Sequence, residues 1–274
     1  MKKTDIKIRQ AKYDLDNMVV MANDMIKGIS KLSLNEAKLL RTIIMQIKPY
    51  DEELEVFTVK ADEFAAILGI DKNHIYAEID KMTDHLLDEK IRIGDKTTKK
   101  KSKWKKFRWV DYCEYDTGTL TIKLSDQLRP YLLGLQKWYT QYRLEDIIFF
   151  KSWYSIRIYE LLMMCIDERK KPYADKIVDI YMSLKDLRTY TETEKKYARL
   201  SQFKAKVLNI AVRDINEWSA YHVTVREYKE KKKIVGFYFS VGSKIGYNYK
   251  NISEELPEHV EQMNLFDMMD GEKS

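Results

Sequence analysis

Residues 197–218, YARLSQFKAKVLNIAVRDINEW, set the architecture of the carboxyl-terminal part of this 274-residue chain. At about 100° per residue the apolar side chains fall within one arc, which predicts an amphipathic helix. The arc consists of Leu200, Phe203, Val207, Ile210, Ala211 and Ile215. The opposite side carries a narrow line that contains no acid: Gln202, Lys206, Asn209 and Arg213. Amide and guanidinium groups hydrogen-bond base edges, and cations neutralise phosphates, so this line predicts contact with DNA.

The segments around this helix complete a recognisable unit. A short helix is predicted at 184–189, and strands are predicted at 221–228 and 234–241. Helix, turn, helix and hairpin in this order form the winged-helix variety of the helix-turn-helix. The predicted wing is basic and is expected to contact the DNA backbone through Arg226, Lys229, Lys231, Lys232 and Lys233. Glu227 and Glu230 partly offset this charge.

The same order of elements occurs in the first half of the chain. Ser33 and Glu36 form a capping-box pattern in front of a helix at 34–47. The further predicted elements are a strand at 54–59, helices at 61–68 and 71–87, and strands at 90–93, 107–115 and 119–124. We therefore predict an α+β fold with two tandem winged-helix domains, at 15–134 and 135–248. A helical segment around 125–135 would join them, and residues 249–274 would form a short flexible tail. A helix at 152–165 and a strand at 176–182 would begin the second domain.

The two domains are not expected to contact DNA equally. The 71–87 helix is predicted to bury Ile75, Ile79, Met82 and Leu86, while its outer face carries Asn73, Ala77, Asp80, Lys81 and Asp84. Two carboxylates facing a groove would repel phosphates and accept only from cytosine amino groups. This pattern favours dimerisation or auxiliary DNA contact for the first domain and base contact for the second.

The first domain also has a basic hairpin. The segment 96–108 holds the cations Lys96, Lys99, Lys100, Lys101, Lys103, Lys105, Lys106 and Arg108, with Trp104, Phe107 and Trp109 interleaved or adjacent. We expect Lys99, Lys100, Lys101 and Lys103 above all to cross the DNA backbone as a wing. The alternative is a solvated loop whose lysines prevent edge pairing of the hairpin.

Charge and composition limit the classes of protein. The chain has a net charge of +6, divided into −5 for residues 250–274 and +11 for residues 1–249. A basic body suggests a polyanionic partner, although the same charge would also keep the body soluble. The sequence has neither a long apolar run nor a secretory signal, so we expect a cytoplasmic protein without a membrane partner. Cys113 and Cys165 could form a disulfide, but two free thiols are favoured in that compartment.

Enzyme signatures are absent from the sequence. There is no G-x-x-x-x-G-K-[ST] phosphate loop, and the four histidines form no H-x-H or H-E-x-x-H pair. The two cysteines form no C-x-x-C, and no metal or other cofactor is expected. A rolling-circle nickase needs a metal-binding histidine pair beside its tyrosine nucleophile. We therefore expect a protein that is not an enzyme and has no catalytic residues.

Three stretches resemble the replication initiator (Rep) family of theta-replicating, iteron-containing bacterial plasmids. They are VVMANDMIKGISKLSLNEAKLLRTIIMQIKP (19–49), IRIYELL (156–162) and RLSQFKAKVLNIAVRDINEWSAYHV (199–223). The resemblance covers most of residues 15–245. It implies that the second winged helix binds the major groove through Arg199, Gln202, Lys206, Asn209 and Arg213. It also implies that the first domain supplies a dimer surface.

The tail contains a short motif of its own. Gln262, Met263, Leu265 and Phe266 resemble the glutamine-to-Leu-Phe peptide by which bacterial proteins dock on the replicative sliding clamp. An amide for the pocket rim and three apolar anchors fit that role, and an acidic segment can fold on binding. The alternative is a tail that packs on its own domain.

These observations predict a plasmid replication initiator. It would bind origin repeats in double-stranded DNA, help to open the origin, and recruit the host initiator, the replicative helicase and the sliding clamp. Its own copies would exchange between monomer and dimer, as the resemblance implies. Two alternatives stay open: a winged-helix transcriptional repressor without an initiator role, and a DNA-nicking rolling-circle initiator.

Overall fold

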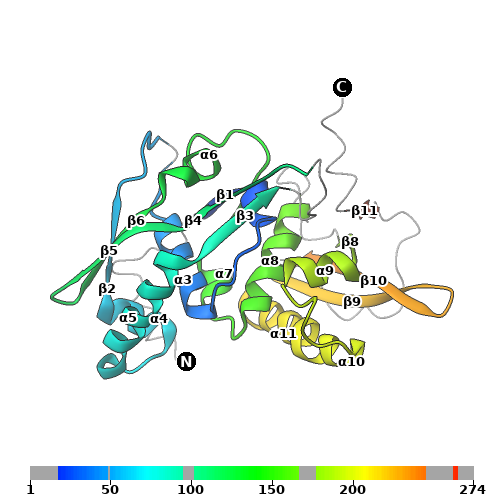
Figure 1. The fold of residues 1–274 in the computed structure, drawn as a ribbon. Helices are drawn as coiled ribbons and strands as arrows, with labels where there is room; N and C mark the ends of the chain where they lie inside the picture. The colour runs from blue at the N-terminus through cyan, green and yellow to red at the C-terminus, as the bar shows by residue number, and fades with distance from the viewer. Residues whose placement is uncertain (1–17, 49, 95–101, 167–176, 245–261, 265–274) are drawn as a thin grey trace. The chain divides into compact units, whose positions relative to one another are not determined.

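The computed structural model describes residues 18–48, 50–94, 102–166, 177–244 and 262–264, the last of these by its backbone only. The chain divides into two compact units, Met1–Phe149 and Phe150–Ser274 (Figure 1). Both units combine helices with antiparallel sheet, as the predicted fold class requires.

In its described residues, the first unit combines helices of 4 to 17 residues with three small sheets. Its helices are α2 (Asn23–Ile26), α3 (Leu34–Ile44), α4 (Ala61–Leu68), α5 (Lys72–Asp88), α6 (Arg129–Leu132) and α7 (Glu145–Ile148), with a 3-10 turn at Asp126–Leu128. Its strands are β1 (Met18–Ala22), β2 (Val56–Lys60), β3 (Lys90–Gly94), β4 (Trp104–Arg108), β5 (Val110–Asp116), β6 (Thr119–Leu124) and β7 (Tyr139–Arg143). The strands pair as β2-β6-β5, β3-β4 and β1-β7, all antiparallel.

Local sequence explains the helices of the first unit. The capping box is confirmed: the Ser33 hydroxyl accepts from the Glu36 backbone N–H, and the Glu36 carboxylate accepts from the Ser33 N–H at 2.7 Å. Gly69 ends α4 at φ 70°, a left-handed conformation that glycine adopts without a Cβ clash. The Asp71 side chain caps α5 by accepting from the Asn73 N–H at 2.8 Å.

In the part of the second unit that the structure describes, there is one sheet and one long interrupted helix. Its helices are α8 (Trp153–Cys165), α9 (Leu184–Tyr190), α10 (Leu200–Phe203) and α11 (Asn209–Trp218), with a π-helical segment at Lys204–Leu208. Its strands are β8 (Ile177–Ser183), β9 (Tyr221–Glu230), β10 (Lys233–Ser243) and β11 (Gln262–Asn264), in the order β11-β8-β10-β9. The wing hairpin β9–β10 and β8 are antiparallel, and β11 adds to β8 in parallel. Phe203, Phe237 and Phe239 are almost fully buried in its core.

Three features differ from the sequence-based expectation. The strand predicted at 107–115 is two strands, because Trp109 turns inward between β4 and β5 and the chain passes from one sheet to another. The joining helix predicted around 125–135 is reduced to a 3-10 turn and the four-residue α6. Beyond it, β7 pairs with β1, so the first compact unit extends to Phe149, whereas the sequence-based boundary was placed at 134/135.

Cys113 and Cys165 are not joined by a disulfide. Cys165 is buried at the end of α8, and Cys113 is half-buried on β5. Burial raises the pKa of the Cys113 thiol to about 11, which keeps it protonated and unreactive near neutral pH.

Candidate nucleic-acid interface

The amphipathic helix of the second unit has the predicted inner face. Phe203, Val207, Ala211 and Ile215 are fully buried, and Leu200 and Ile210, which complete the predicted arc, are half-buried. The preceding α9 is capped by Ser183, whose hydroxyl accepts from the Asp186 N–H at 3.0 Å. The amphipathic helix therefore packs against the rest of the unit through the apolar face that its sequence predicts to be buried.

The outer face of the same helix presents the predicted line to solvent. Gln202, Lys206, Asn209 and Arg213 are all exposed within this unit, and so is Arg199, the residue in front of α10. The Arg213 side chain is 63% exposed, with a loose ion pair of 3.6 Å to its neighbour Asp214. The exposure of the line is thus confirmed, and its contact with DNA stays a prediction.

A π-helical segment interrupts this helix at Lys204–Leu208. Val207 and Leu208 in this segment are both buried. The same segment carries Lys204, whose Nζ lies 2.5 Å from the Glu227 Oε1 on β9. This ion pair lowers the pKa of the Glu227 carboxyl, because the charged form is stabilised by Lys204.

A buried carboxylate fixes the helix against α8. Asp214, on α11, is fully buried and accepts from the Lys151 backbone N–H at 2.8 Å and from the Ser155 hydroxyl at 2.6 Å. Ser155 lies in the first turn of α8. The outer face of α11 is therefore set by a buried polar contact as well as by apolar packing.

The predicted cations of the wing differ in their surroundings: some are exposed at its tip, and others form ion pairs within the protein. Lys231, Lys232 and Lys233 are exposed at the tip of the β9–β10 hairpin, where Lys231 adopts φ 55°. Arg226 instead lies on the sheet, with a guanidinium nitrogen 2.6 Å from the Asp179 Oδ2, and its Cζ lies 5.7 Å from the Tyr238 ring centre. Lys229 lies 3.4 Å from Glu227, so it is also engaged within the protein.

The corresponding helix of the first unit, α5, has the predicted faces. Ile75, Ile79, Met82 and Leu86 are buried. Asn73, Ala77, Asp80, Lys81 and Asp84 are exposed. The outer face of α5 is thus uncovered within its unit and carries two acids.

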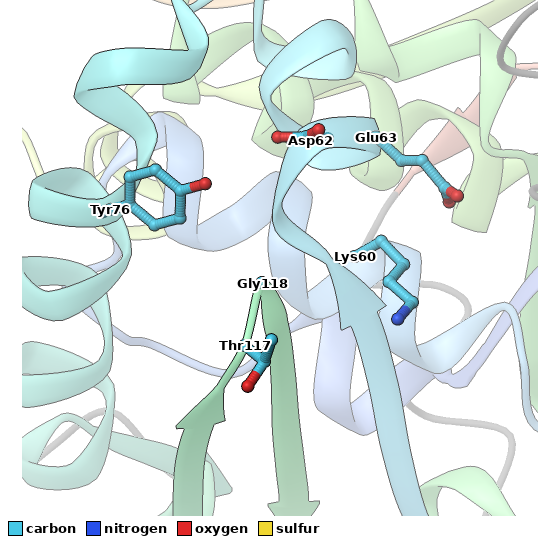
Figure 2. Close-up of a pocket in the computed structure, with 6 residues that line it drawn as sticks. All are labelled: Lys60, Asp62, Glu63, Tyr76, Thr117 and Gly118. Atoms are coloured by element: carbon cyan, nitrogen blue, oxygen red, sulfur yellow. The ribbon is translucent and has the colours of Figure 1, made fainter.

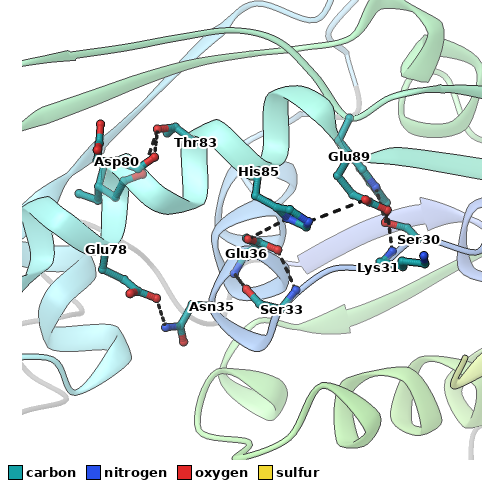
Figure 3. A network of polar contacts seen from close by, with 12 residues as sticks. Ser30, Lys31, Ser33, Asn35, Glu36, Glu78, Asp80, Thr83, His85 and Glu89 are labelled. Atoms are coloured by element: carbon teal, nitrogen blue, oxygen red, sulfur yellow. Dashed lines mark hydrogen bonds and ion pairs between the residues drawn. The ribbon is translucent and has the colours of Figure 1, made fainter. Parts of the chain in front are cut away.

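A polar network joins α5 to α3 (Figure 3). The His85 Nδ1 lies 3.0 Å from the Glu36 Oε1, and the His85 Nε2 lies 3.9 Å from the Glu89 Oε2. Further along α5, Glu78 accepts from the Asn35 side-chain amide at 2.8 Å. These contacts bind one side of α5 to α3, while the side that carries Asp80 and Asp84 faces solvent.

The hairpin β3–β4 corresponds to the predicted first wing. Lys99, Lys100 and Lys101 lie outside the described residues, while Lys103 is exposed next to β4. Trp104 is 52% exposed, and the Arg92 Cζ lies 4.9 Å from its ring centre. Trp109, expected with the aromatic residues of this wing, is 2% exposed, and its indole N–H donates to the Ser30 hydroxyl at 2.8 Å. It is a core residue rather than a wing residue.

The first unit also contains an open pocket of about 590 Å³ (Figure 2). It is lined by Lys60, Asp62, Glu63, Tyr76, Thr117 and Gly118. The Lys60 Nζ donates to the Thr119 hydroxyl at 2.8 Å, and the Asp62 Oδ2 lies 3.0 Å from the Lys72 Nζ. The lysine and the aspartate of the pocket are thus engaged in structural contacts.

Among the described residues, no three His, Cys, Asp or Glu side chains are close enough together to hold a metal ion. In the same part of the chain, no helix has the length and apolar character needed to cross a membrane.

Three features near the candidate interface were not predicted from the sequence. They are the ion pair of Lys204 with Glu227, the burial of Asp214, and the structure of the segment 191–199 between α9 and α10. Lys195 and Lys196 in that segment are exposed, and their adjacency to the amphipathic helix is a signal that the sequence does offer.

Two models of one protein family match this chain, one in each unit for most of its length. Residues 18–163 match the model described as "Initiator Replication protein, WH1", and residues 183–241 match "Initiator Rep protein, WH2". A relative from Escherichia coli, described as a replication initiation protein, is 24% identical over 212 residues. The alignment covers 76% of this chain and 65% of that protein, so the chain spans slightly less than two thirds of the relative's length.

A solved structure shares the fold. The Pi initiator protein, crystallised in complex with iteron DNA, superimposes with a TM-score of 0.67 at 19% identity. The match covers 84% of this chain and 98% of that chain. Both units therefore have the winged-helix architecture of that protein.

Proposed function

We propose that this chain, which belongs to the initiator replication protein family, initiates plasmid replication by binding origin repeats in double-stranded DNA. The observation that carries the proposal is the exposed, acid-free line Gln202, Lys206, Asn209 and Arg213, in a unit whose wing tip is also exposed and basic. The iteron DNA in the crystal structure of the similarly folded Pi initiator supports it.

The second unit would supply base recognition. A helix of this width enters the major groove, where glutamine and asparagine can pair with adenine, and arginine and lysine with guanine. The exposed tip lysines, Lys231, Lys232 and Lys233, would meet backbone phosphates on the adjacent strand. Arg226 would act mainly through its ion pair with Asp179, which shapes the wing.

The first unit would contribute a dimer surface and auxiliary DNA contact. Asp80 and Asp84 on the outer face of α5 oppose close approach to phosphates, which favours a role other than base contact. Tyr76 and Tyr115 are 48% and 42% exposed, with ring centres 5.8 Å apart, and this exposed aromatic pair would contact a second copy. Its wing lysines, Lys99, Lys100, Lys101 and Lys103, would contact the backbone.

The remaining parts of the proposal concern host proteins. Binding would help to open an A·T-rich segment and recruit the host initiator and helicase, and the tail would dock on the sliding clamp. Gln262 and Met263 lie in β11, which pairs with Asp179 and Ile180 of β8, while Leu265 and Phe266 lie outside the described residues. A tail strand paired with β8 cannot occupy the clamp cleft at the same time, so docking requires its release.

The tail is tested with a peptide spanning 257–270, titrated against bacterial clamp. Micromolar binding that is lost on Leu265→Ala and Phe266→Ala is expected. No binding at hundreds of micromolar, or equal binding by the substituted peptide, would exclude clamp docking.

DNA binding is tested with the full chain on an origin fragment located by footprinting. Lys206→Ala and Arg213→Ala should each weaken binding to the repeat by about 1–3 kcal/mol, because each would remove a base contact. Lys151→Ala, an exposed lysine before α8, is the matched control and should leave the affinity unchanged. Equal affinity of the unsubstituted protein for the origin fragment and for random duplex would contradict the proposal.

Two further assays separate the alternatives. A plasmid that lacks its initiator gene should be maintained only when this chain is supplied. Promoter binding without such maintenance would indicate a repressor. Supercoiled origin plasmid should stay covalently closed in the presence of the chain and a divalent metal, whereas strand cleavage would indicate a nicking initiator.

A further inference from the structure

The segment between α9 and α10, residues 191–199, is held by hydrogen bonds of its own side chains. The Thr191 hydroxyl donates to the Leu187 carbonyl at 2.6 Å and lies 2.9 Å from the Thr193 hydroxyl. The Thr189 hydroxyl donates to Glu194 at 2.7 Å. Thr191 and Thr193 are fully buried, so this connection has a small core of its own and a defined conformation.

Arg188, the fifth residue of α9, is the centre of this segment. Its guanidinium donates to three backbone carbonyls, those of Thr193 at 3.1 Å, Lys196 at 3.0 Å and Tyr197 at 2.9 Å. Its Cζ also lies 4.7 Å from the ring centre of Phe203, which is fully buried in the amphipathic helix. One side chain therefore ties the segment to both helices of the helix-turn-helix.

The guanidinium of Arg188 is bound to backbone carbonyls within the protein, whereas two lysines of the segment face solvent. Lys195 and Lys196 are exposed on the segment, three or four residues before Arg199 and the start of α10. Glu194 is also exposed, although its carboxylate accepts from the Thr189 hydroxyl, and Glu192 is half-buried. Among the exposed side chains of the segment, the cations Lys195, Lys196 and Arg199 outnumber the single acid Glu194.

We propose that the α9–α10 segment is a further DNA contact, in which Lys195 and Lys196 bind backbone phosphates beside the groove entered by the helix. Arg188 acts as a positioning residue that holds both lysines in register with the base-contacting line. The inference rests on the proposed DNA binding and deepens it. A fixed backbone reduces the conformational freedom that the lysines lose on binding, so these two cations are better placed than cations on a mobile loop.

The first test is a salt titration of the full chain on duplex origin repeats and on random duplex of equal length. Lys195→Gln/Lys196→Gln should reduce the slope of log K against log salt by about 1.8, since each phosphate contact contributes about 0.9. The preference for the repeat over random duplex should stay unchanged, because phosphate contacts carry no sequence information. Lys151→Gln, exposed in the same unit, should leave the slope as it is.

The second test separates positioning from stability. Arg188→Lys keeps the charge but cannot bridge three carbonyls, so it should make the salt slope shallower and weaken repeat binding while thermal unfolding still shows a folded chain. An unchanged slope in a folded Arg188→Lys variant would overturn the positioning role. An unchanged slope in Lys195→Gln/Lys196→Gln, or an equal loss in Lys151→Gln, would overturn the contact itself. Absence of DNA binding by the unsubstituted chain would instead contradict the proposed function.

Discussion

The Nζ of Lys204 lies 2.5 Å from the Oε1 of Glu227, which links the amphipathic helix of the second unit to the first strand of its wing. Lys204 belongs to the π-helical segment, and Glu227 also lies 3.4 Å from Lys229. One acid thus engages two cations that border the predicted DNA surface. It sets the position of the wing relative to the helix and at the same time competes with phosphates for both lysines.

Removing the Glu227 carboxylate should strengthen binding to random duplex and lower the preference for origin repeats. In Glu227→Gln the lysines Lys204 and Lys229 become available to phosphates, so affinity for random duplex should rise by about 2- to 5-fold. The salt slope should steepen by up to about 1.8, the equivalent of two contacts. The preference for origin repeats should fall, because the wing is no longer held to the helix. Fluorescence anisotropy on both duplexes measures all three quantities, and weaker binding to random duplex would contradict the prediction.

The buried carboxylate of Asp214 should be a major source of stability for the second unit. Asp214→Ala leaves the Lys151 N–H and the Ser155 hydroxyl without their acceptor, at a cost of about 2–4 kcal/mol in the free energy of unfolding. Glu217→Ala, at an exposed position one turn later in α11, is the control and should change it by less than about 0.5 kcal/mol. Urea denaturation followed by circular dichroism gives both values. Similar values for the two variants would show that the buried contact is not important.

His222, on β9, predicts a dependence of stability on pH. Partial burial lowers its pKa, and the charge of Lys244 lowers it further, so the folded protein favours the neutral ring. The unfolded chain takes up a proton near pH 6.5, which the folded chain does not. Stability is therefore complete above about pH 6.5 and falls as the pH decreases toward the lower pKa of the folded state. The melting temperature between pH 7.5 and 5.5 should vary less in His222→Gln, while the exposed His74→Gln should retain the full dependence.

The hairpin β3–β4 should contribute electrostatic affinity without specificity. Lys103, Lys105 and Lys106 are exposed beside or on β4, and their replacement by glutamine should reduce the salt slope by up to about 2.7. The ratio of repeat to random binding should stay constant. Lys81→Gln on the acidic face of α5 serves as the control. An unchanged slope would identify these lysines as a solvated edge that prevents strand pairing.

Periodicity and capping signals predicted most of the helices and the tandem order. Ser33 with Glu36, Gly69 and Asp71 each act locally, so the ends of α3, α4 and α5 follow from adjacent residues. The strands β1 and β7 were not predicted, since their pairing joins Met18–Ala22 to Tyr139–Arg143 across more than a hundred residues. No short-range pattern carries that information, and the boundary between the units depends on it.

In the candidate interface, too, features set by adjacent residues were predicted, and features set by distant residues were not. The exposed line on the amphipathic helix follows from a single period, and the structure retains it. The π-helical turn, the role of Arg188 and the pairing of Arg226 with Asp179 depend on partners elsewhere in the second unit. A cation count from sequence therefore places Arg226 with the wing tip, whereas its ion pair assigns it to the sheet.

The strand β11 has a consequence for the sheet that it extends. It consists of three residues and pairs with Asp179, Ile180 and Tyr181 of the seven-residue β8, whose other side is bonded to β10. A chain truncated before Gln262 would expose the backbone donors and acceptors of these three residues to pairing with strands of other molecules. Loss of the acidic tail would thus remove net negative charge and also leave an unpaired strand edge. Proteolysis before Gln262 should therefore promote self-association of the protein.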